Sequence, residues 1–297
     1  MLTGNEKTCG LAIISWRSWD TLIATLESYR NLGLFSHFDR SFIYFQDISE
    51  RDRQIAAQFN LACSGGPKCG IADGMCNAAT ELATDFVLFL ENDCPVIESA
   101  DDVMHQLMGA LNHLETGAID VMRLHSRLHP GEAFSDVRKY LRYYEPQHPE
   151  PCVDLTTYQS EARHRRWRRF FKRYNLARLK GRAVYVEQAA ETLFPEVIQK
   201  TADGIWIIDS SCADWTNQSV LCRRTFFTDI LMPYVDAHPS SRTSNGFQSP
   251  ERPLNCRWWR NRHFKIGQGK GLFTHRRVDG SWRTEHPAYE DVLAESL

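Results

Sequence analysis

The first 125 residues alternate short apolar runs with stretches of helical periodicity. The apolar runs have the length and continuity of strands that are covered on both faces, and they comprise residues 10–16, 41–47, 85–90 and 119–124. Apolar residues recur at helical spacing between these runs, in residues 18–33, 50–59, 71–83 and 101–115. Residues 64–70 (SGGPKCG) read as a loop, because glycine and proline interrupt regular structure. The order predicts an α/β fold, with right-handed βαβ units around a mostly parallel sheet flanked by helices.

The pattern weakens after residue 125. Apolar runs return at residues 204–209 (GIWIID) and 226–234, and residues 256–283 are rich in Trp, Arg and His. We therefore expect two halves of one domain, residues 1–125 and residues 126–297, of which the second faces the substrate.

Composition narrows the class of protein. The chain has 297 residues, 42% of them hydrophobic, and a formal net charge of −2, so no global positive field attracts nucleic acid. No apolar run approaches the roughly 20 residues that cross a bilayer, and the first ten residues lack the pattern of a signal peptide. The nine cysteines include no C-x-x-C pair, which favours reduced thiols over a zinc site. We expect a cytoplasmic protein.

The run FVLFLENDCPV (residues 86–96) places two acids directly after a predicted strand. With a period of two, Glu91 and Asp93 point the same way and Asn92 points the opposite way. Neighbouring carboxylates repel each other unless a cation lies between them or one of them is protonated, and oxygen ligands of this kind suit Mg²⁺ or Mn²⁺. A helix cap or a solvated turn is the alternative, because the acid-x-acid pattern is short.

Two longer stretches carry a resemblance to a known family. Residues 13–29 (IISWRSWDTLIATLESY) and 65–94 (GGPKCGIADGMCNAATELATDFVLFLENDC) resemble the opening strand and helix, the Gly-rich loop and the acid-x-acid strand end of family-2-like glycosyltransferases, which have the GT-A fold. Glu91 stands where that family usually has aspartate. The resemblance implies a nucleotide-sugar donor, UDP-sugar before GDP-sugar, and a Mn²⁺ or Mg²⁺ ion. It makes Asp93 the principal metal ligand and places Glu91 nearer the ribose or a metal-bound water.

The resemblance also implies a donor pocket in the first half. Its expected residues share a place at a strand end or in the loop and helix that follow, and they are Ser15, Arg17, Asp47, Lys68, Gly70, Ile71, Asn77, Glu91 and Asn92. Lys68 and the backbone amides of Gly70 and Ile71 are expected to face phosphate. Asp47 reads equally well as a turn acid, and Asn77 as a surface amide. The loop is neither a Walker loop nor a GxGxxG fingerprint.

In the second half, ERPLNCRWWRNRHFKI (residues 251–266) resembles the family's Glu-Asp pair and following helix, with Arg252 in place of the aspartate. The resemblance implies that an acid of this pair is the catalytic base, which makes Glu251 the first candidate and Asp214 the second. A carboxylate can take the acceptor's proton as it attacks the anomeric carbon. Glu251 also reads as a first-turn helix acid. A late histidine, His275, is an expected metal ligand or an ordinary polar residue, beside Arg276 and Arg277 as possible diphosphate contacts.

Aromatic and basic residues of this half suggest acceptor contacts. Trp215, Asn217 and Trp258 are candidates for binding a glycan or glycolipid acceptor, although large aromatics are more often core. The basic run at residues 163–182 fits an anionic membrane surface, or a solvated face paired with acids; no nucleic-acid motif accompanies it.

The leading functional hypothesis is therefore a metal-dependent, inverting glycosyltransferase. A sugar-1-phosphate nucleotidyltransferase and a non-catalytic nucleotide-sugar or glycan-binding module are the alternatives. Burial of Asp93 against an arginine, with no room for phosphate, would contradict the leading hypothesis.

Overall fold

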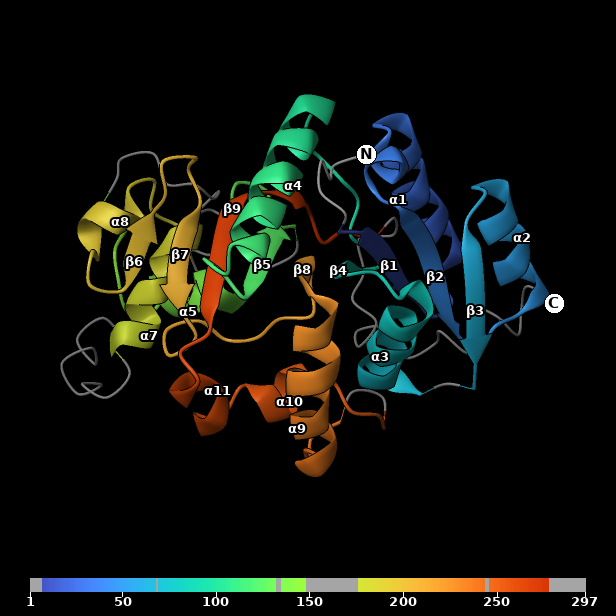
Figure 1. Ribbon diagram of the computed structural model, residues 1–297. Coiled ribbons are helices and arrows are strands. Elements are labelled where there is room, and N and C mark those ends of the chain that lie inside the picture. Colours follow the sequence, from blue (N-terminus) through green and yellow to red (C-terminus); the bar gives the residue numbers. More distant parts are fainter. Residues whose placement is uncertain (1–6, 68, 132–134, 148–175, 244–245, 278–297) are drawn as a thin grey trace.

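The computed structural model of the protein describes residues 7–67, 69–131, 135–147, 176–243 and 246–277. Within these residues nine strands form one sheet, in the order β3-β2-β1-β4-β8-β5-β9-β7-β6 (Figure 1). The strands are β1 (Cys9–Ser15), β2 (Arg40–Gln46), β3 (Ala62–Gly66), β4 (Phe86–Glu91), β5 (Val121–His125), β6 (Ile198–Lys200), β7 (Trp206–Asp209), β8 (Val220–Arg223) and β9 (Lys265–Phe273).

The helices connect these strands and cover both faces of the sheet. The α-helices are α1 (Trp19–Asn31), α2 (Glu50–Gln58), α3 (Gly70–Leu82), α4 (Ala100–Glu115), α5 (Ser135–Leu141), α7 (Leu176–Gly181), α8 (Ala190–Leu193), α9 (Met232–Ala237), α10 (Glu251–Leu254) and α11 (Arg257–Asn261). Two 3₁₀ turns, η1 (Leu34–His37) and η5 (Arg182–Tyr185), and a π-helical stretch, η6 (Phe226–Leu231), complete the list.

The first half contains the predicted βαβ units. Strands β1 to β4 pair in parallel, with β1 between β2 and β4. Alternate residues of β1 face opposite layers: Leu11 and Ile13 pack with α1, α2 and α4, whereas Ala12 and Ile14 pack with α3 and α9. Figure 1 shows α1 and α4 on one side of the sheet and α3 and α9 on the other. The predicted α/β fold with a mostly parallel core is confirmed.

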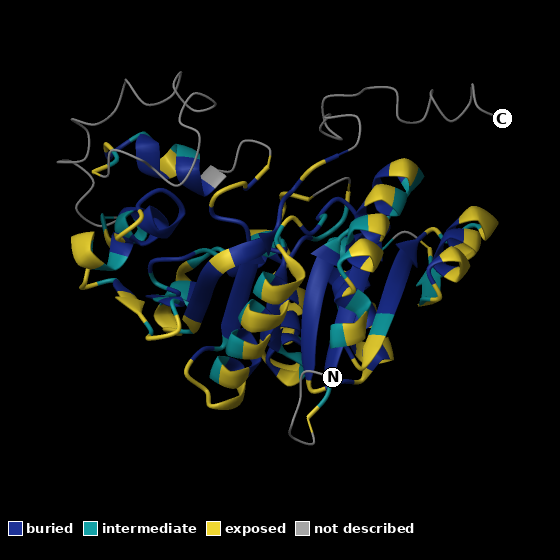
Figure 2. Cartoon of the chain, turned by 90° about the horizontal axis from the view of Figure 1, so that it is seen from above, coloured by how far each residue is buried: buried dark blue, intermediate teal, exposed yellow. Residues whose placement is uncertain are grey.

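The second half extends the same sheet. Strand β8 lies between β4 and β5 and is antiparallel to both. Strand β9 pairs in parallel with β5, and β7 and β6 add antiparallel strands at the edge. Figure 2 shows the strands buried between helices whose exposed residues point outward. The two predicted halves are therefore joined by continuous strand pairing.

One prediction about the first half was wrong. Ser64, Gly65 and Gly66 were expected in a loop, but they belong to β3 and pair with β2. A Cβ atom on Gly65 would lie 2.3 Å from the Phe45 carbonyl oxygen, so only glycine fits this close approach of two strands. In the sequence these glycines indicated a loop. In the structure they allow the edge strand β3 to pack closely against β2.

Two features bear on the class of protein. No helix among the described residues is long and apolar enough to span a bilayer. The cysteines in the described part of the chain are free thiols, and they are Cys9, Cys63, Cys69, Cys76, Cys94, Cys212, Cys222 and Cys256.

Candidate functional site

The carboxyl ends of β1 and β4 lie side by side at the point where the strand order reverses. The chain proceeds from β1 outward to β2 and β3, and then returns to β4 on the other side of β1. Ile14 is in register with Glu91, so the segments that follow each strand are neighbours. In open α/β sheets ligands bind beyond the carboxyl ends of the strands at such a switch point. The structure therefore brings the predicted residues after β1 and after β4 together.

Asn92 joins these two segments. Its backbone N–H donates to the Ile14 carbonyl (3.1 Å), and its side-chain Nδ2 donates to the Arg17 carbonyl (3.2 Å). Arg17 and Ser18 have positive φ angles of 54° and 58°, a conformation that is costly for residues other than glycine. These contacts hold the strained turn after β1 against the end of β4, and the predicted contact of Asn92 with the nucleotide remains a prediction.

Arg17 and Asp47 form an accessible pair across neighbouring strand ends. Arg17 Nη2 lies 3.7 Å from Asp47 Oδ2, and the Arg17 guanidinium lies 5.4 Å from the centre of the Trp16 ring. The Asp47 side chain is 59% exposed. Ser15 in the same region is 1% exposed. Arg17 and Asp47 can thus meet a polar ligand, whereas Ser15 is buried beneath them.

The loop and helix after β3 use several of their predicted ligand groups internally. The Gly70 amide donates to Gln46 Oε1 (2.9 Å), and Asn77 Nδ2 donates to the Tyr44 hydroxyl (2.9 Å). A Cβ atom on Gly70 would lie 2.3 Å from Phe247 Cβ, so this glycine packs against another segment. The Gly70 amide, which was expected to face phosphate, is therefore taken up by Gln46, whereas Asn77 remains a predicted residue of the donor pocket. Ile71 is partly buried, and Lys68 lies outside the described residues.

Asp93 and His275 meet although they are far apart in the chain. Asp93 Oδ2 lies 3.4 Å from His275 Nε2 and 3.5 Å from Arg277 Nε. The Arg276 amide donates to the Asp93 carbonyl (2.9 Å), which holds the segment after β9 against the end of β4. Gln218 Nε2 lies 3.3 Å from the other ring nitrogen of His275. The nitrogen that faces Asp93 is therefore Nε2.

The Asp93 carboxylate is almost completely buried. Its side chain is 4% exposed, and it lines neither a cavity of about 280 Å³ beside α4 nor a cavity of about 550 Å³ beside α10. His275 and Arg277 cover it, and the Arg277 guanidinium already compensates its charge. Burial of Asp93 against an arginine, with no room for phosphate, would argue against a diphosphate site. The contact with Arg277 meets the first part of that condition.

The donor set at this position still suits a divalent ion. A carboxylate and an imidazole are ligands that Mn²⁺ accepts, and Mg²⁺ and Mn²⁺ commonly complete their shells with water and phosphate oxygens. Glu91, the last residue of β4, is partly exposed nearby. Among the described residues no three His, Cys, Asp or Glu side chains are grouped closely enough to hold an ion by themselves. The protein fits an ion only if a ligand supplies further oxygen atoms.

Glu251 and Asp214, the two candidate bases, line the cavity of about 550 Å³. Glu251 Oε1 accepts a hydrogen bond from the Asn217 amide (3.0 Å). Burial raises the pKa of the Glu251 carboxyl above its ordinary value; the charge of Asp136 adds to this, and the Asn217 amide, the Thr216 side chain and Arg252 oppose it. A raised pKa favours a carboxylate that can accept a proton near neutral pH.

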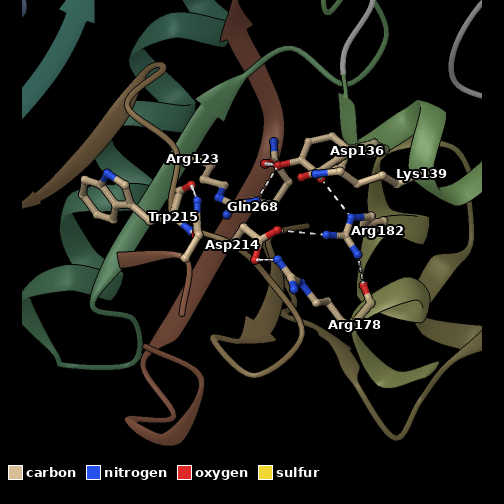
Figure 3. A network of polar contacts seen from close by, with 10 residues as sticks. Arg123, Asp136, Lys139, Arg178, Arg182, Asp214, Trp215 and Gln268 are labelled. Atoms are coloured by element: carbon tan, nitrogen blue, oxygen red, sulfur yellow. Dashed lines mark hydrogen bonds and ion pairs between the residues drawn. The ribbon is translucent and has the colours of Figure 1, made fainter. Parts of the chain in front are cut away.

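Asp214 belongs to a network of ion pairs (Figure 3). Its carboxylate contacts the guanidinium groups of Arg178 and Arg182, with 2.9 Å to Arg182 Nη2. Arg182 Nε also donates to Asp136 Oδ1 (2.9 Å), and Lys139 Nζ lies 3.7 Å from the same oxygen. Arg178 and Arg182 lie at the end of the predicted basic run, and this end pairs with acids as one alternative expected, but Arg182 is buried and not on a solvated face. Residues 163–175 lie outside the described residues.

The tryptophan candidates have different surroundings. Trp215 is 2% exposed, stacks on Phe227 (6.1 Å between ring centres) and meets Trp259 edge-on. Its indole points away from the Asp214 network in Figure 3, although Trp215 is among the residues that line the cavity of about 550 Å³, and its acceptor contact remains a prediction. Trp258 is partly exposed and stacks on Tyr234 at 3.9 Å. Asn217 is buried; it accepts from the Trp215 indole N–H (2.9 Å) and donates to Ser249 (3.0 Å).

Residues 216–218 connect the two clusters of polar groups. The Asn217 amide contacts Glu251, and the next side chain, Gln218, contacts His275, which contacts Asp93. No motif or periodicity in the sequence predicted the contact of Gln218 with His275 or the pairing of Asp136 with Arg182. Such pairs join segments that no local pattern relates.

No protein-family model matches the chain, and no curated protein matches it. Solved structures match parts of it. Glucosyl-3-phosphoglycerate synthase from Mycobacterium tuberculosis, in complex with Mn²⁺, UDP and glucosyl-3-phosphoglycerate, is 12% identical, over 40% of this chain and 43% of that one, with a TM-score of 0.32. Mannosyl-3-phosphoglycerate synthase from Rubrobacter xylanophilus is 20% identical, over 42% of each chain, with a TM-score of 0.33.

A cytidylyltransferase from Leptospira borgpetersenii serovar Hardjo-bovis is 15% identical, over 41% of this chain and 58% of that one, with a TM-score of 0.33. The chain thus spans less than half the length of either synthase. Solved structures of glycosyltransferases and of a nucleotidyltransferase are thus similar to this chain to the same low degree. The similarity therefore does not distinguish between these activities.

Proposed function

We propose that the protein transfers a sugar from a nucleotide-diphosphate sugar, UDP-sugar in the first place, to a hydroxyl of a glycan or glycolipid. The supporting observation is the meeting of Asp93 and His275 at the switch point of the sheet. One carboxylate and one imidazole there suit Mn²⁺ or Mg²⁺, and the accessible Arg17 and Asp47 flank the same strand ends. An ion at this place neutralises the charge of a leaving diphosphate.

The residues of this chain have distinct roles in the proposal. Arg17 and Asp47 bind the nucleoside through hydrogen bonds. Asp93 and His275 hold the ion, and the Arg277 guanidinium moves from Asp93 to the diphosphate, whose oxygens match its fork of donors.

Glu251 is the base in this proposal. Its raised pKa suits proton transfer from the acceptor hydroxyl, whereas two guanidinium groups occupy the Asp214 carboxylate. A single displacement with Glu251 as the base predicts inversion at the anomeric carbon. Contacts through Asn217 and Gln218 connect Glu251 to His275, and this connection supports the choice of base.

The test is a screen of nucleotide sugars with Mn²⁺ or Mg²⁺, in which release of free nucleoside diphosphate is measured. Asp93→Asn should lower the release by about 100-fold or more, because it removes charge that the site directs at the reaction. Asp101→Asn, on the exposed face of α4, is the matched control and should leave the release unchanged. Undiminished release by Asp93→Asn would remove the proposal. Pyrophosphate formed from a nucleoside triphosphate and a sugar phosphate would assign the nucleotidyltransferase class instead.

A further inference from the structure

Arg252 is the residue that the proposed function leaves unexplained. It directly follows Glu251 in α10, at the position where the resemblance to family-2-like glycosyltransferases implies an aspartate. Its side chain is exposed and lines the cavity of about 550 Å³. Within the described part of the chain, no carboxylate lies within ion-pair distance of Arg252. An acid was expected at the rim of this cavity, and a cation is present.

A second arginine lines the same cavity. Arg242 is exposed, and it too has no ion pair with any described residue. Its backbone is held in place, because the Arg242 amide donates to Ser240 Oγ (3.1 Å) and Gln248 bonds the Ser240 amide and carbonyl (2.9 Å each). The cavity therefore has two available guanidinium groups, from the segment after α9 and from α10.

The other cations around the cavity already have acidic partners. Arg178 pairs with Asp214, Lys139 pairs with Asp136, and Arg182 bridges both carboxylates from behind (Figure 3). Glu251 is the remaining acid of the lining, so four cationic side chains of the lining face three acidic ones. The cavity consequently carries an excess of positive charge, located on Arg242 and Arg252.

We propose that this cavity binds an anionic, hydroxylated ligand, with Arg242 and Arg252 holding its phosphate or carboxylate group and Glu251 facing a hydroxyl. Planar guanidinium groups match the oxygens of both anions. A cavity of several hundred Å³ has the size of sites for small molecules, so a sugar phosphate or a uronic acid fits it. As far as the ligand is the sugar acceptor, the inference rests on the proposed function; the anion site itself does not.

The experiment measures binding to the full chain by calorimetry, with glucose 6-phosphate, glucuronate and glucose as probes. Both anions should bind and glucose should bind at least about 10-fold more weakly, because it lacks the charge-assisted hydrogen bonds. Arg252→Gln and Arg242→Gln should each weaken binding of the anions by about 10–100-fold. Arg252→Lys should lie between, since it keeps the charge and loses the fork of donors. A preference for one anion identifies the phosphate or the carboxylate as the group recognised.

The matched control is Arg257→Gln, an exposed arginine of α11 outside the cavity, which should bind as the unaltered protein does. Equal binding of glucose and the anions, or unchanged binding by both cavity variants, would overturn the inference. These measurements need no nucleotide sugar, so they separate the two proposals. Anion binding without release of nucleoside diphosphate would refute the glycosyltransferase and leave the anion site standing.

Discussion

At the scale of single residues, the surroundings of Glu251 distinguish it from the other acids of the cavity. Asp136 and Asp214 contact guanidinium groups, whereas Glu251 is bound by a backbone amide. When a carboxyl group is buried away from water and contacts no cation, its ionised form is disfavoured and its pKa rises. The raised pKa therefore follows from the fold, and it makes a prediction about stability as well as about activity.

Glu251→Gln should make the protein more stable at pH 7. The folded-state pKa of Glu251 lies above that of the unfolded chain, so its contribution to stability is present at low pH and is lost as the pH rises from the unfolded pKa to the folded one. Glutamine does not ionise, so the protein no longer loses this stability as the pH rises. Its side-chain oxygen can still accept the hydrogen bond from the Asn217 amide. Urea unfolding should show the gain at pH 7 and no difference below about pH 4, where glutamate in the unfolded chain is protonated.

The same variant should lose turnover by about 100-fold or more, because glutamine cannot take a proton. Glu81→Gln, an exposed position near the end of α3, should change neither quantity. Lower stability of Glu251→Gln at pH 7 would show that the charged form is favoured in the fold, which contradicts the desolvated site.

At the scale of elements, β4 is the strand on which both the core and the candidate site depend. Leu88 is fully buried and is in register with Leu11 of β1 and Leu221 of β8. The same strand ends at Glu91, two residues before Asp93. Its sequence predicted the strand and the acids, because a continuous apolar run is typical of a strand buried on both faces. The β3 strand escaped prediction because its glycines serve strand packing.

Leu88→Ala should cost about 2–5 kcal/mol of the free energy of unfolding, the range for a leucine removed from a packed core. The reason is lost burial together with a cavity between the layers. Chemical denaturation measures it. Leu193→Ala, at a leucine that is 37% exposed in α8, should change the free energy by no more than about 0.5 kcal/mol. Similar effects of the two variants would contradict the central place of β4.

At the scale of the whole molecule, the return of the chain through β8 unites the two halves. Strand β8 comes from residues 220–223 but lies between β4 and β5, which both belong to the first 125 residues. Without it the first half has no strand between β4 and β5. The boundary at residue 125 therefore remains a proposal about function, with the donor on one side and the acceptor on the other.

The full chain should unfold in a single transition, with circular dichroism and tryptophan fluorescence giving coincident curves. A fragment of residues 1–125 should lack a cooperative transition, because β4 loses its neighbour β8 and β5 loses β8 and β9. Exposed strand edges of this kind also promote association. A fragment that unfolds cooperatively as a monomer would show that the first half is a folding unit by itself.

The sequence alone determined the alternation of strands and helices in the first half, and the acids that follow β4. These features are local: periodicity sets which face of an element is buried, and strand ends follow from where the apolar run stops. A resemblance, and not a pattern, named both Asp93 and His275 as metal ligands; the structure brings the two within 3.4 Å of each other, and their role as ligands remains a prediction.

Only the tertiary structure decided what each polar group contacts. Arg277 covers Asp93, Gln46 takes the Gly70 amide, and Phe227 covers Trp215. The reason is physical: a buried polar group takes whichever partner the folded chain brings within hydrogen-bond distance. Partners drawn from β2, β8 and the segment after β9 are neighbours only because one sheet gathers them, and no local periodicity records that.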